Sequence, residues 1–369
     1  MTVHSLVCCG DLVLDEPDPE FWLSGIAPCL RDAQLAIGHL EVPHTRRGRE
    51  MAADVPAPGA DPAHLAAVAD AGIDAVTLAG NHIADCGADG IADTLCELDR
   101  LGIRHCGAGP NLRQARKPAW LESGDLRVAV LSYNCVGPQE SWAQARSAGC
   151  AYVRVLPEDG GAIRPAARLR DTDPVSVNQM AEDIRAASDA GAQCCVVALH
   201  KGIVHTPAIL APYERPLAHA AIDAGADVVI GHHAHILRGI ELYRDRPIFH
   251  GLGNGCVVTR ALSPGQSNPK RAEWARQRRV LFGFEPDPEY FLAPFHPDAV
   301  HGMLARVLIE DGRLAAVGFV PVFVEPPGRP TLAQGAAADA VVHYVTRISR
   351  EAGLPPLQYV VGGDMVRIL

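Results

Sequence analysis

The chain has 369 residues, of which 48% are hydrophobic and 21% charged, a composition typical of a globular protein with an ordinary core. Its net charge of −10 disfavours nucleic acid as a partner, because nucleic-acid-binding proteins usually present a basic face. No apolar run reaches the roughly 18 residues of a membrane span, and no apolar signal segment precedes the first expected strand. We therefore expect a cytoplasmic protein with no membrane partner.

Short apolar runs alternate with alanine-rich stretches, which predicts an α/β architecture. Taken in chain order, the expected elements are a helix at 62–71, a strand at 73–79, a helix at 90–101, a strand near 103, a strand at 126–132, a helix at 176–190, a strand at 194–199, a helix at 214–224, and strands at 226–230 and 247–251. Strands at 303–309 and 315–323 flank Glu310-Asp311-Gly312, a hairpin turn signal, and suggest a second, more antiparallel sheet.

Neither an internal repeat nor a domain linker is visible in the sequence. We expect one domain over residues 1–330, with inserted loops at 135–175 and 258–300, and a C-terminal helix and tail over 331–369 packed on it. Long loops in a compact domain are usually functional lids or disordered segments. The second of these loops carries a basic stretch, 270–279, and several aromatic side chains that could bind an acidic or aromatic peptide or simply face solvent.

Five of the expected strands end in polar side chains that can bind a metal ion. The clearest case is 226–235, where an apolar strand stops at Gly231 and is followed by His233 and His235, two residues apart. The other four are the apolar runs 6–10, which ends in Asp11, 35–40, which ends in Glu41, 75–80, which is followed by Asn81, His82 and Asp85, and 195–199, which ends in His200. Because ligand sites of open α/β sheets lie outside the carboxyl ends of the strands, we expect these side chains to converge.

This set combines carboxylate and amide oxygens with imidazole nitrogens and contains no sulfur. Such donors suit divalent Mn, Zn or Fe better than Ca or Mg, and the lack of thiolates disfavours a structural zinc cage. We therefore expect one or two divalent metal ions per chain.

The chain resembles the calcineurin-like metallophosphoesterase superfamily, in its CapA (poly-γ-glutamate capsule) branch. The resemblance covers residues 5–257 and implies a four-layer αββα sandwich of the metallo-dependent phosphatase type. The motifs that carry it are Gly10-Asp11, Leu40-Glu41, Gly80-Asn81-His82-x-x-Asp85-x-Gly87, Leu199-His200-x-Gly202, Gly231-x-His233-x-His235 and Leu252-Gly253-Asn254.

The resemblance also implies a role for each site residue. Glu41 would bridge two metal positions, and Asn81, His200 and His233 would complete the better-formed one. The second position would use Asp11 and His235, but Val13 stands where phosphoesterases usually supply a further histidine. His82 would act on the substrate without binding metal and would be oriented by Asp85.

Two reactions are compatible with these residues. The chain is also similar to the peptide epimerase of lasso-peptide biosynthesis, which implies epimerisation at the α-carbon of a C-terminal residue of a ribosomal precursor peptide. Asp11, His82 and His296 are the candidate acid/base groups for this isomerase chemistry, and His296 lies on a loop stiffened by Pro294 and Pro297. The alternative is a CapA-like, metal-dependent hydrolase of a phosphoester or amide related to poly-γ-glutamate.

Neither reaction identifies the sequence of the substrate. The expected partner is a peptide substrate, which a leader-binding protein could present to the enzyme. A metal-stabilised binding protein without turnover is a third class, and an intact His82 and Asp85 argue against it.

Overall fold

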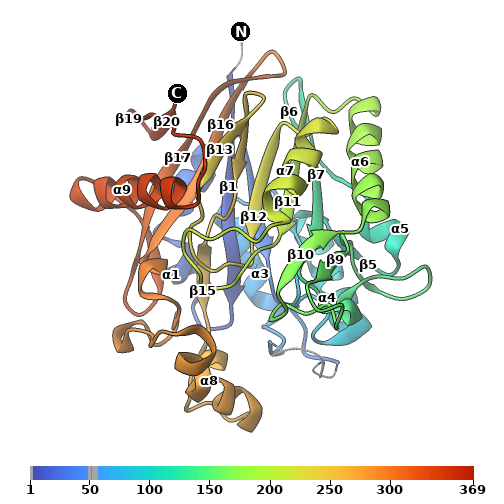
Figure 1. Cartoon of the computed structure of the whole chain (residues 1–369), viewed down its shortest axis with the longest axis vertical. Coiled ribbons are helices and arrows are strands. Elements are labelled where there is room, and N and C mark those ends of the chain that lie inside the picture. Colours follow the sequence, from blue (N-terminus) through green and yellow to red (C-terminus); the bar gives the residue numbers. More distant parts are fainter. Residues whose placement is uncertain (1–2, 49–50, 52–56) are drawn as a thin grey trace.

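The computed structural model describes residues 3–48, 51 and 57–369. Its two main β-sheets pack against each other as two layers (Figure 1). The first sheet has ten strands. They are β1 (Val3–Leu14), β2 (Leu35–Leu40), β3 (Ala75–Thr77), β4 (Arg104–Cys106), β15 (Asn254–Val258), β16 (His301–Glu310), β17 (Arg313–Glu325), β18 (Arg329–Leu332), β19 (Tyr359–Gly362) and β20 (Met365–Ile368).

The second sheet has six strands in the order β13-β14-β12-β11-β7-β6. Their bounds are β6 (Ala119–Ser123), β7 (Leu126–Asn134), β11 (Cys194–His200), β12 (Val228–His232), β13 (Ile240–Tyr243) and β14 (Arg246–Phe249). Strands β1 to β4 pair in parallel in the first sheet, as do β7, β11, β12 and β14 in the second. Two short pairs lie outside these sheets: β5 (Ala108–Gly109) with β8 (Gly149–Cys150), and β9 (Val155–Pro157) with β10 (Leu169–Thr172).

The main helices lie between strands, as the alternating pattern predicts. They are α1 (Pro19–Leu23), α2 (Ala27–Asp32), α3 (Leu65–Asp70), α4 (Gly87–Leu101), α5 (Leu112–Ala115), α6 (Pro174–Asp189), α7 (Glu214–Asp223), α8 (Pro269–Phe282) and α9 (Ala336–Glu351). Short 3-10 turns are η1 (Pro62–His64), η2 (Gln139–Ser141), η3 (Arg260–Leu262), η4 (Pro288–Tyr290) and η5 (Pro297–Val300). Local signals set the ends: Asp173 caps α6 by accepting from the Val175 N–H, and Gly102 ends α4 at φ 75°.

Alternation of side chains along the strands produces the four layers. Leu6 of β1 packs with Val196 of β11 in the apolar cluster between the sheets. Val7 points the other way, into the cluster that also contains Val68 of α3 on one outer face and Ile184 of α6 on the other. Each fully buried aliphatic side chain contributes about 1.5–3 kcal/mol. The chain is therefore an α/β protein with an αββα arrangement, as expected.

One expectation about the sheets is wrong. Strands β16 and β17 form the predicted hairpin across Asp311-Gly312, but they do not build a separate sheet. Strand β16 pairs antiparallel with β1, Val3 opposite Glu310 and Cys8 opposite Ala305, so the hairpin extends the first sheet. The edge of β1 is available to β16 because β15 pairs only with the later part of β1, from Asp11 to Leu14.

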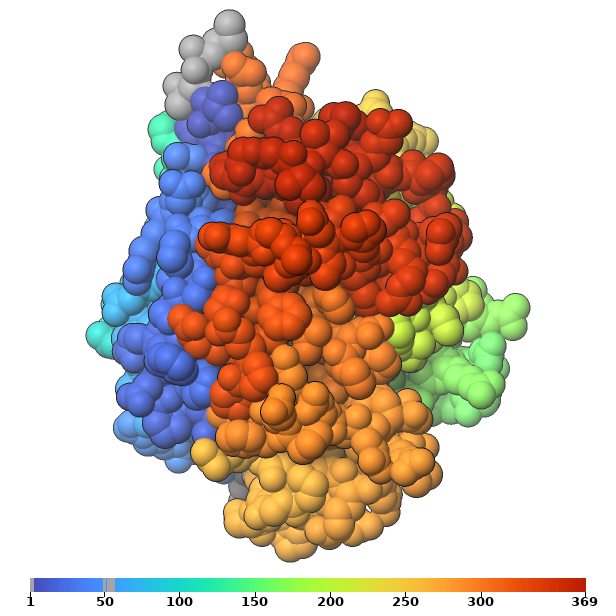
Figure 2. All heavy atoms as spheres, turned by 90° about the vertical axis from the view of Figure 1, so that its left-hand side faces the viewer, coloured from blue at the N-terminus to red at the C-terminus, as the bar shows by residue number. Residues whose placement is uncertain are grey.

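The two inserted loops and the C-terminal segment contain more regular structure than expected. Residues 135–175 hold η2 and strands β8 to β10, and residues 258–300 hold α8 and three 3-10 turns. In the C-terminal segment, α9 contacts β16 and β17, and β20 pairs with β17, so the tail adds strands to the first sheet. Figure 2 shows this segment over the upper part of one face, with α8 and its neighbours at the lower end.

No helix in the part of the chain that the structure describes combines the length and apolar character needed to cross a membrane.

Candidate metal centre

Both sheets contribute to a single cluster of polar side chains. Asp11 lies in β1 where its pairing with β2 and β15 shifts in register, and Glu41 directly follows β2. His200 is the last residue of β11, and His233 directly follows β12. Asn81 lies in the loop after β3. The predicted convergence of strand ends is therefore present.

Asp11 is the centre of the cluster. Its Oδ1 lies 3.1 Å from Nδ1 of His232, and its Oδ2 accepts from the backbone N–H of His233 at 3.3 Å. Nδ1 of His235 lies 3.6 Å from Asp11 Oδ2, while its Nε2 lies 3.3 Å from Oε1 of Glu41. Asp11, Glu41 and His235 thus offer ligand atoms within 4.8 Å of one another, a spacing that one metal ion can draw together.

The other predicted ligands lie beside this group. Nε2 of His200 is 2.7 Å from Oδ1 of Asn81, and the rings of His200 and His233 have centroids 4.9 Å apart. His82 stands next in the chain, and its Nδ1 lies 2.7 Å from Oδ2 of Asp85. The fully buried Asp85 carboxylate holds the His82 ring in one orientation, as the resemblance implied.

The backbone after β12 is strained. His233 and His235 adopt φ values of 86° and 52°, in the left-handed region that non-glycine residues rarely enter. Each such residue costs on the order of 1–3 kcal/mol and persists only where its surroundings hold it. Here the hydrogen bond from the His233 N–H to Asp11 helps to hold it, and strain of this kind is concentrated at ligand sites.

The donor atoms fit a divalent metal ion. Both carboxylate oxygens of Glu41 and both ring nitrogens of His233 are buried without a hydrogen-bond partner among the described residues, apart from the ionic contact of Glu41 with His235. A buried polar atom without a partner costs about 1–3 kcal/mol. A cation ligated by these oxygens and nitrogens would remove that cost, and the set suits Mn, Zn or Fe.

Burial and neighbouring charges shift the pKa values of the side chains in this cluster in different directions. Burial lowers the pKa of His233 to about 3, which leaves a neutral ring with a lone pair for a metal. Burial alone would raise the pKa of Glu41, but the charge of His235 brings it to about 2. Glu41 and Asp11 in turn raise the pKa of His235 to about 9 against the effect of burial. Burial and the Glu41 charge raise the pKa of Asp11 to about 7.

A cavity of about 190 Å³ opens beside the cluster. The polar part of its lining includes Glu41, Asn81, His82, His233 and His235. The apolar part includes Val13, Val257, Leu262, Trp274, Phe282 and Phe295. Much of this apolar lining comes from the 258–300 insertion, so that insertion shapes the site.

The structure places His296 outside this cavity. His296 lines a smaller neighbouring cavity of about 50 Å³ with Asn254 and Tyr290, and its Nδ1 accepts from the Asp298 N–H at 3.1 Å. Its neighbour Phe295 lines both cavities and stacks on His235, with centroids 4.8 Å apart. The role of His296 as a proton carrier stays a prediction.

Three histidines of the site were not predicted from the sequence. His39 and His232 are buried beside Asp11, and His205 lines the cavity with φ 55°. His39 precedes Glu41 by two residues in an extended chain, which places both side chains on one face and could have identified it. His205 lies in a loop and offers no such pattern.

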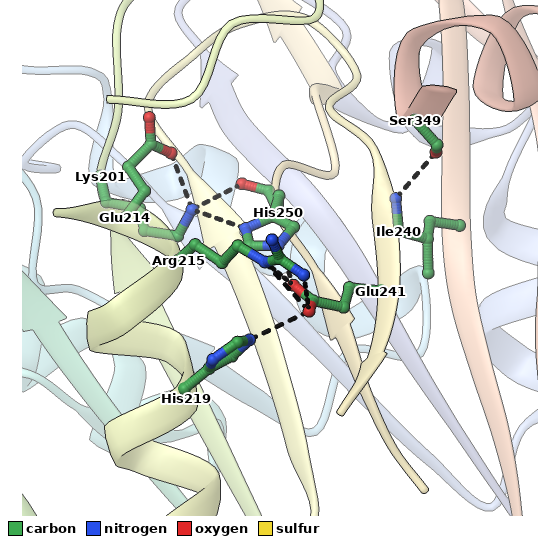
Figure 3. A network of polar contacts seen from close by, with 8 residues as sticks. All are labelled: Lys201, Glu214, Arg215, His219, Ile240, Glu241, His250 and Ser349. Carbon is green, nitrogen blue, oxygen red and sulfur yellow. Dashed lines mark hydrogen bonds and ion pairs between the residues drawn. The ribbon is translucent and has the colours of Figure 1, made fainter. Parts of the chain in front are cut away.

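A buried ionic network supports the cluster from behind (Figure 3). Lys201, next to His200, is fully buried, and its Nζ donates to Glu214 Oε2 at 2.8 Å and to the His250 carbonyl at 3.1 Å. Glu241 accepts from Arg215 and lies 3.2 Å from Nε2 of His250, so α7 and β13 are joined through it. These contacts fix the backbone that carries His200.

Residues 5–257 match the family described as bacterial capsule synthesis protein PGA_cap. This chain belongs to that family. The match covers more than half of the 369 residues and ends just beyond the Asn254 motif, where the resemblance drawn from the sequence motifs also ends. The CapA-branch resemblance is therefore confirmed, whereas the lasso-peptide epimerase remains a prediction.

Named relatives of this capsule synthesis family member are longer proteins. It is 36% identical over 180 residues to a Mycobacterium tuberculosis protein named as a probable polyglutamine synthesis accessory protein. The aligned residues make up 48% of this chain and 43% of that protein. It is 29% identical over 188 residues to the capsule biosynthesis protein CapA of Bacillus anthracis, covering 51% of this chain and 41% of that protein. The chain thus spans less than half of either relative.

Among solved structures, the calcineurin-like phosphoesterase YfkN of Bacillus subtilis aligns with 95% of this chain and 96% of its own at 12% identity and a TM-score of 0.39. Similarity at this level carries no weight for function. The layers, sheet order and clustered ligands described above characterise the fold directly.

Proposed function

We propose that this chain is a metal-dependent enzyme that acts on the backbone of a peptide-type substrate. The observation that carries the proposal is the cavity itself, whose lining combines carboxylate and imidazole groups with aliphatic and aromatic side chains. Arg271 is the single arginine among the described lining residues. A peptide with an apolar side chain matches both the polar and the apolar parts of this lining.

A divalent metal bound by Glu41, Asn81, His200 and His233 would supply Lewis acidity toward a substrate carbonyl oxygen. The chain's own residues supply the rest. His82, oriented by Asp85 at 2.7 Å and lining the cavity, is placed to give or take a proton at the reacting group. The apolar lining residues exclude water from part of the cavity, which strengthens the electrostatic interactions inside it.

Family membership favours amide hydrolysis as the reaction. The named relatives are a capsule biosynthesis protein and a probable polyglutamine synthesis accessory protein, and the second name refers to a chain joined by amide bonds. In this reaction water would pass a proton to His82 as its oxygen adds to the carbonyl carbon, the carbon–nitrogen bond would break, and His82 would deliver that proton to the departing nitrogen.

Epimerisation is the second candidate, and Asp11 and His296 would be its proton carriers. Burial and the Glu41 charge raise the pKa of Asp11 to about 7 in the metal-free chain. Asp11 would remove the α-proton of a C-terminal residue of a lasso-type precursor peptide and His296 would return one, but neither residue lines the large cavity, so this reaction needs the substrate to reach beyond it. Cytoplasmic location and presentation by a leader-binding protein belong to this second candidate.

Incubation of the metal-loaded chain with peptides in D₂O separates these reactions. Test substrates are γ-glutamyl oligomers and linear peptides ending in an apolar residue. Cleavage into two products indicates hydrolysis. Uptake of one deuterium in an intact peptide, with inversion detected by chiral amino-acid analysis, indicates epimerisation. Efficient release of phosphate from phosphoesters, with neither peptide reaction, would overturn the proposal.

A further inference from the structure

Strand β19, which spans residues 359–362, forms one edge of the first sheet. Among the described residues it pairs with β20 alone, so its other side is open. Figure 1 places β19 at the end of the molecule away from α8, a helix whose side chains line the cavity. This edge therefore lies outside the metal centre and plays no part in the proposed function.

The other edge strands of the two main sheets carry the usual protection against pairing with a further strand. An edge strand presents unpaired N–H and C=O groups, and proteins commonly place a charged residue or a proline there. In the described part of the chain the protecting residues are Arg104 in β4, Glu122 in β6, Glu241 in β13, and Arg329 with Pro330 in β18. Strand β15 has no charge, but all of its residues are buried. Strand β19 reads Tyr-Val-Val-Gly and has neither protection.

Two neighbouring valines of β19 are exposed to solvent. Val360 exposes 47% of its surface and Val361 exposes 60%. They point to opposite faces of the sheet, because side chains alternate along a strand. Tyr359 is on the same face as Val361 and packs edge-on against Phe319, with centroids 6.0 Å apart. Both faces of the open edge therefore present apolar surface.

Hydrogen bonding to β20 determines which backbone groups of β19 remain for a partner. The N–H of Leu369 donates to the carbonyl of Gln358 at 3.0 Å, and Val360 lies two residues further along the same ladder. Hydrogen-bonded positions recur at every second residue of an antiparallel ladder. The N–H and C=O groups of Tyr359 and Val361 therefore point away from β20, to the open edge.

We propose that β19 pairs antiparallel with β19 of a second copy of this chain, so that the first sheets of two chains join across a two-fold axis. In the register centred on Val360, this residue lies opposite Val360 of the second copy, and Tyr359 lies opposite Val361. Every outward N–H and C=O group of Tyr359 and Val361 then has a partner.

The sequence of β19 is complementary to itself in this register. An aromatic side chain opposite a β-branched one is a favourable cross-strand pair, and valine opposite valine buries apolar surface on both sides of the axis. No like charges meet, because β19 has no charged residue. Identical chains most often associate through one patch related by a two-fold axis. Because the strand is short, we expect a weak dimer that forms as concentration rises.

Sedimentation velocity of the full chain from about 1 μM to about 1 mM, the range of weak association, tests the proposal. The wild type is expected to change from monomer to dimer within this range. Val360→Glu places two carboxylates opposite each other at the axis, while Arg367 lies across from it on β20 of the same chain and keeps the hairpin intact. The dissociation constant is expected to rise at least about tenfold.

Val280→Glu is the matched control, since Val280 is 87% exposed but lies on α8, and it is expected to dimerise as the wild type does. Sedimentation of the wild type as a monomer at every concentration would overturn the proposal. A dimer that Val360→Glu leaves unchanged would overturn it as well, because the contact would then lie elsewhere.

Cysteine cross-linking tests the register in variants without an added charge. The exposed Cys96 is first replaced by serine. Residues that face each other in a pair without hydrogen bonds have Cα atoms about 4.5 Å apart, a distance that a disulfide can span. Val360→Cys is therefore expected to form a covalent dimer on oxidation, and Val361→Cys, which faces Tyr359, far less. Equal cross-linking at both positions would overturn the proposed pairing. Neither measurement involves metal or turnover, so the dimer and the proposed function can fail separately.

Discussion

Glu41 and His233 show most clearly how single residues specify this centre. Each is buried and presents donor atoms without hydrogen-bond partners among the described residues, a state that is unfavourable unless a ligand is bound. Their positions immediately after β2 and β12 keep the donors on rigid supports, one from each sheet.

Glu41→Ala or His233→Ala is expected to remove metal and activity together. Loss of one of about four ligands weakens both metal affinity and Lewis acidity, so metal content should fall at least tenfold at limiting metal. Metal analysis after gel filtration measures this. His64→Ala, a histidine bonded to the Leu14 carbonyl, is the control. A Glu41→Ala protein with full metal content would show that Glu41 is not a ligand.

Two titrating residues, Asp11 and His235, should make the stability of the metal-free chain depend on pH. The pKa of His235 is raised from 6.5 to about 9 in the folded state, so its stabilising contribution is complete below about pH 6.5 and is lost as pH rises through 9. The pKa of Asp11 is raised from 3.8 to about 7 in the folded state, so it contributes in the same direction. Its stabilising contribution is complete below about pH 3.8 and is lost as pH rises to about 7.

The melting temperature of the metal-free chain should therefore fall between pH 6.5 and 9, whereas the metal-loaded chain should change less because metal binding is favoured as protons leave. Thermal scans in a chelator and in excess metal test this. Glu41→Ala should flatten the metal-free curve, because Glu41 is the main charge that raises the pKa of His235. An equal decline with and without metal would contradict the assignment.

At the scale of elements, the insertion after β15 and the helix α7 serve different purposes. The insertion carries α8, and Trp274 of that helix lines the cavity and packs edge-on against Phe282, with centroids 5.8 Å apart. By contrast, α7 lies behind the site and supplies Glu214 to the buried pair with Lys201. The first should affect substrate binding and the second stability.

Trp274→Ala is expected to raise KM for a substrate with an apolar end while leaving metal content unchanged. Truncation of a buried aromatic contact costs roughly 2 kcal/mol, which corresponds to about a thirtyfold change. Steady-state kinetics measure it, and Arg276→Ala, paired with Glu273 on the exposed side of the same helix, should have little effect. Equal effects of the two substitutions would argue against a substrate contact at Trp274.

Lys201→Met and Glu214→Gln are each expected to destabilise the chain by about 3–5 kcal/mol, because each leaves a fully buried charge without its partner. The double variant Lys201→Met/Glu214→Gln removes both charges and should recover much of this loss. Urea unfolding of the wild type and the three variants gives the coupling free energy. Additive losses in the double variant would mean that the pair is not an interacting unit.

At the scale of the whole molecule, the order of strands and helices could be predicted but the membership of the sheets could not. Alternating apolar patterns identify β7, β11 and β12 because their period reports burial directly. The hairpin of β16 and β17 was equally visible, yet which edge it joins depends on β1, some 300 residues earlier in the chain. No local pattern contains that information.

The residues of the candidate site could also be predicted only where a local sequence pattern marks them. Asp11, Glu41 and His200 could be predicted because each interrupts an apolar run where a strand ends or shifts register. His232 lies within a strand, where a histidine is indistinguishable in sequence from an ordinary packed side chain, and His39 is marked only by its spacing of two residues from Glu41. His39 meets Asp11 through the pairing of β1 with β2, whereas His232 reaches Asp11 only after the two sheets are packed.

This packing bears on the order of events during synthesis. Asp11 and Glu41 come from the first sheet, whereas His200 and His233 come from the second, and residues 301–310 must arrive before the first half of β1 is paired along both edges. A nascent chain on the ribosome thus holds only fragments of the ligand set until the polypeptide is largely translated. We expect metal acquisition to follow chain completion, so that starvation for metal would yield a folded apoprotein awaiting its ion rather than an arrested folding intermediate.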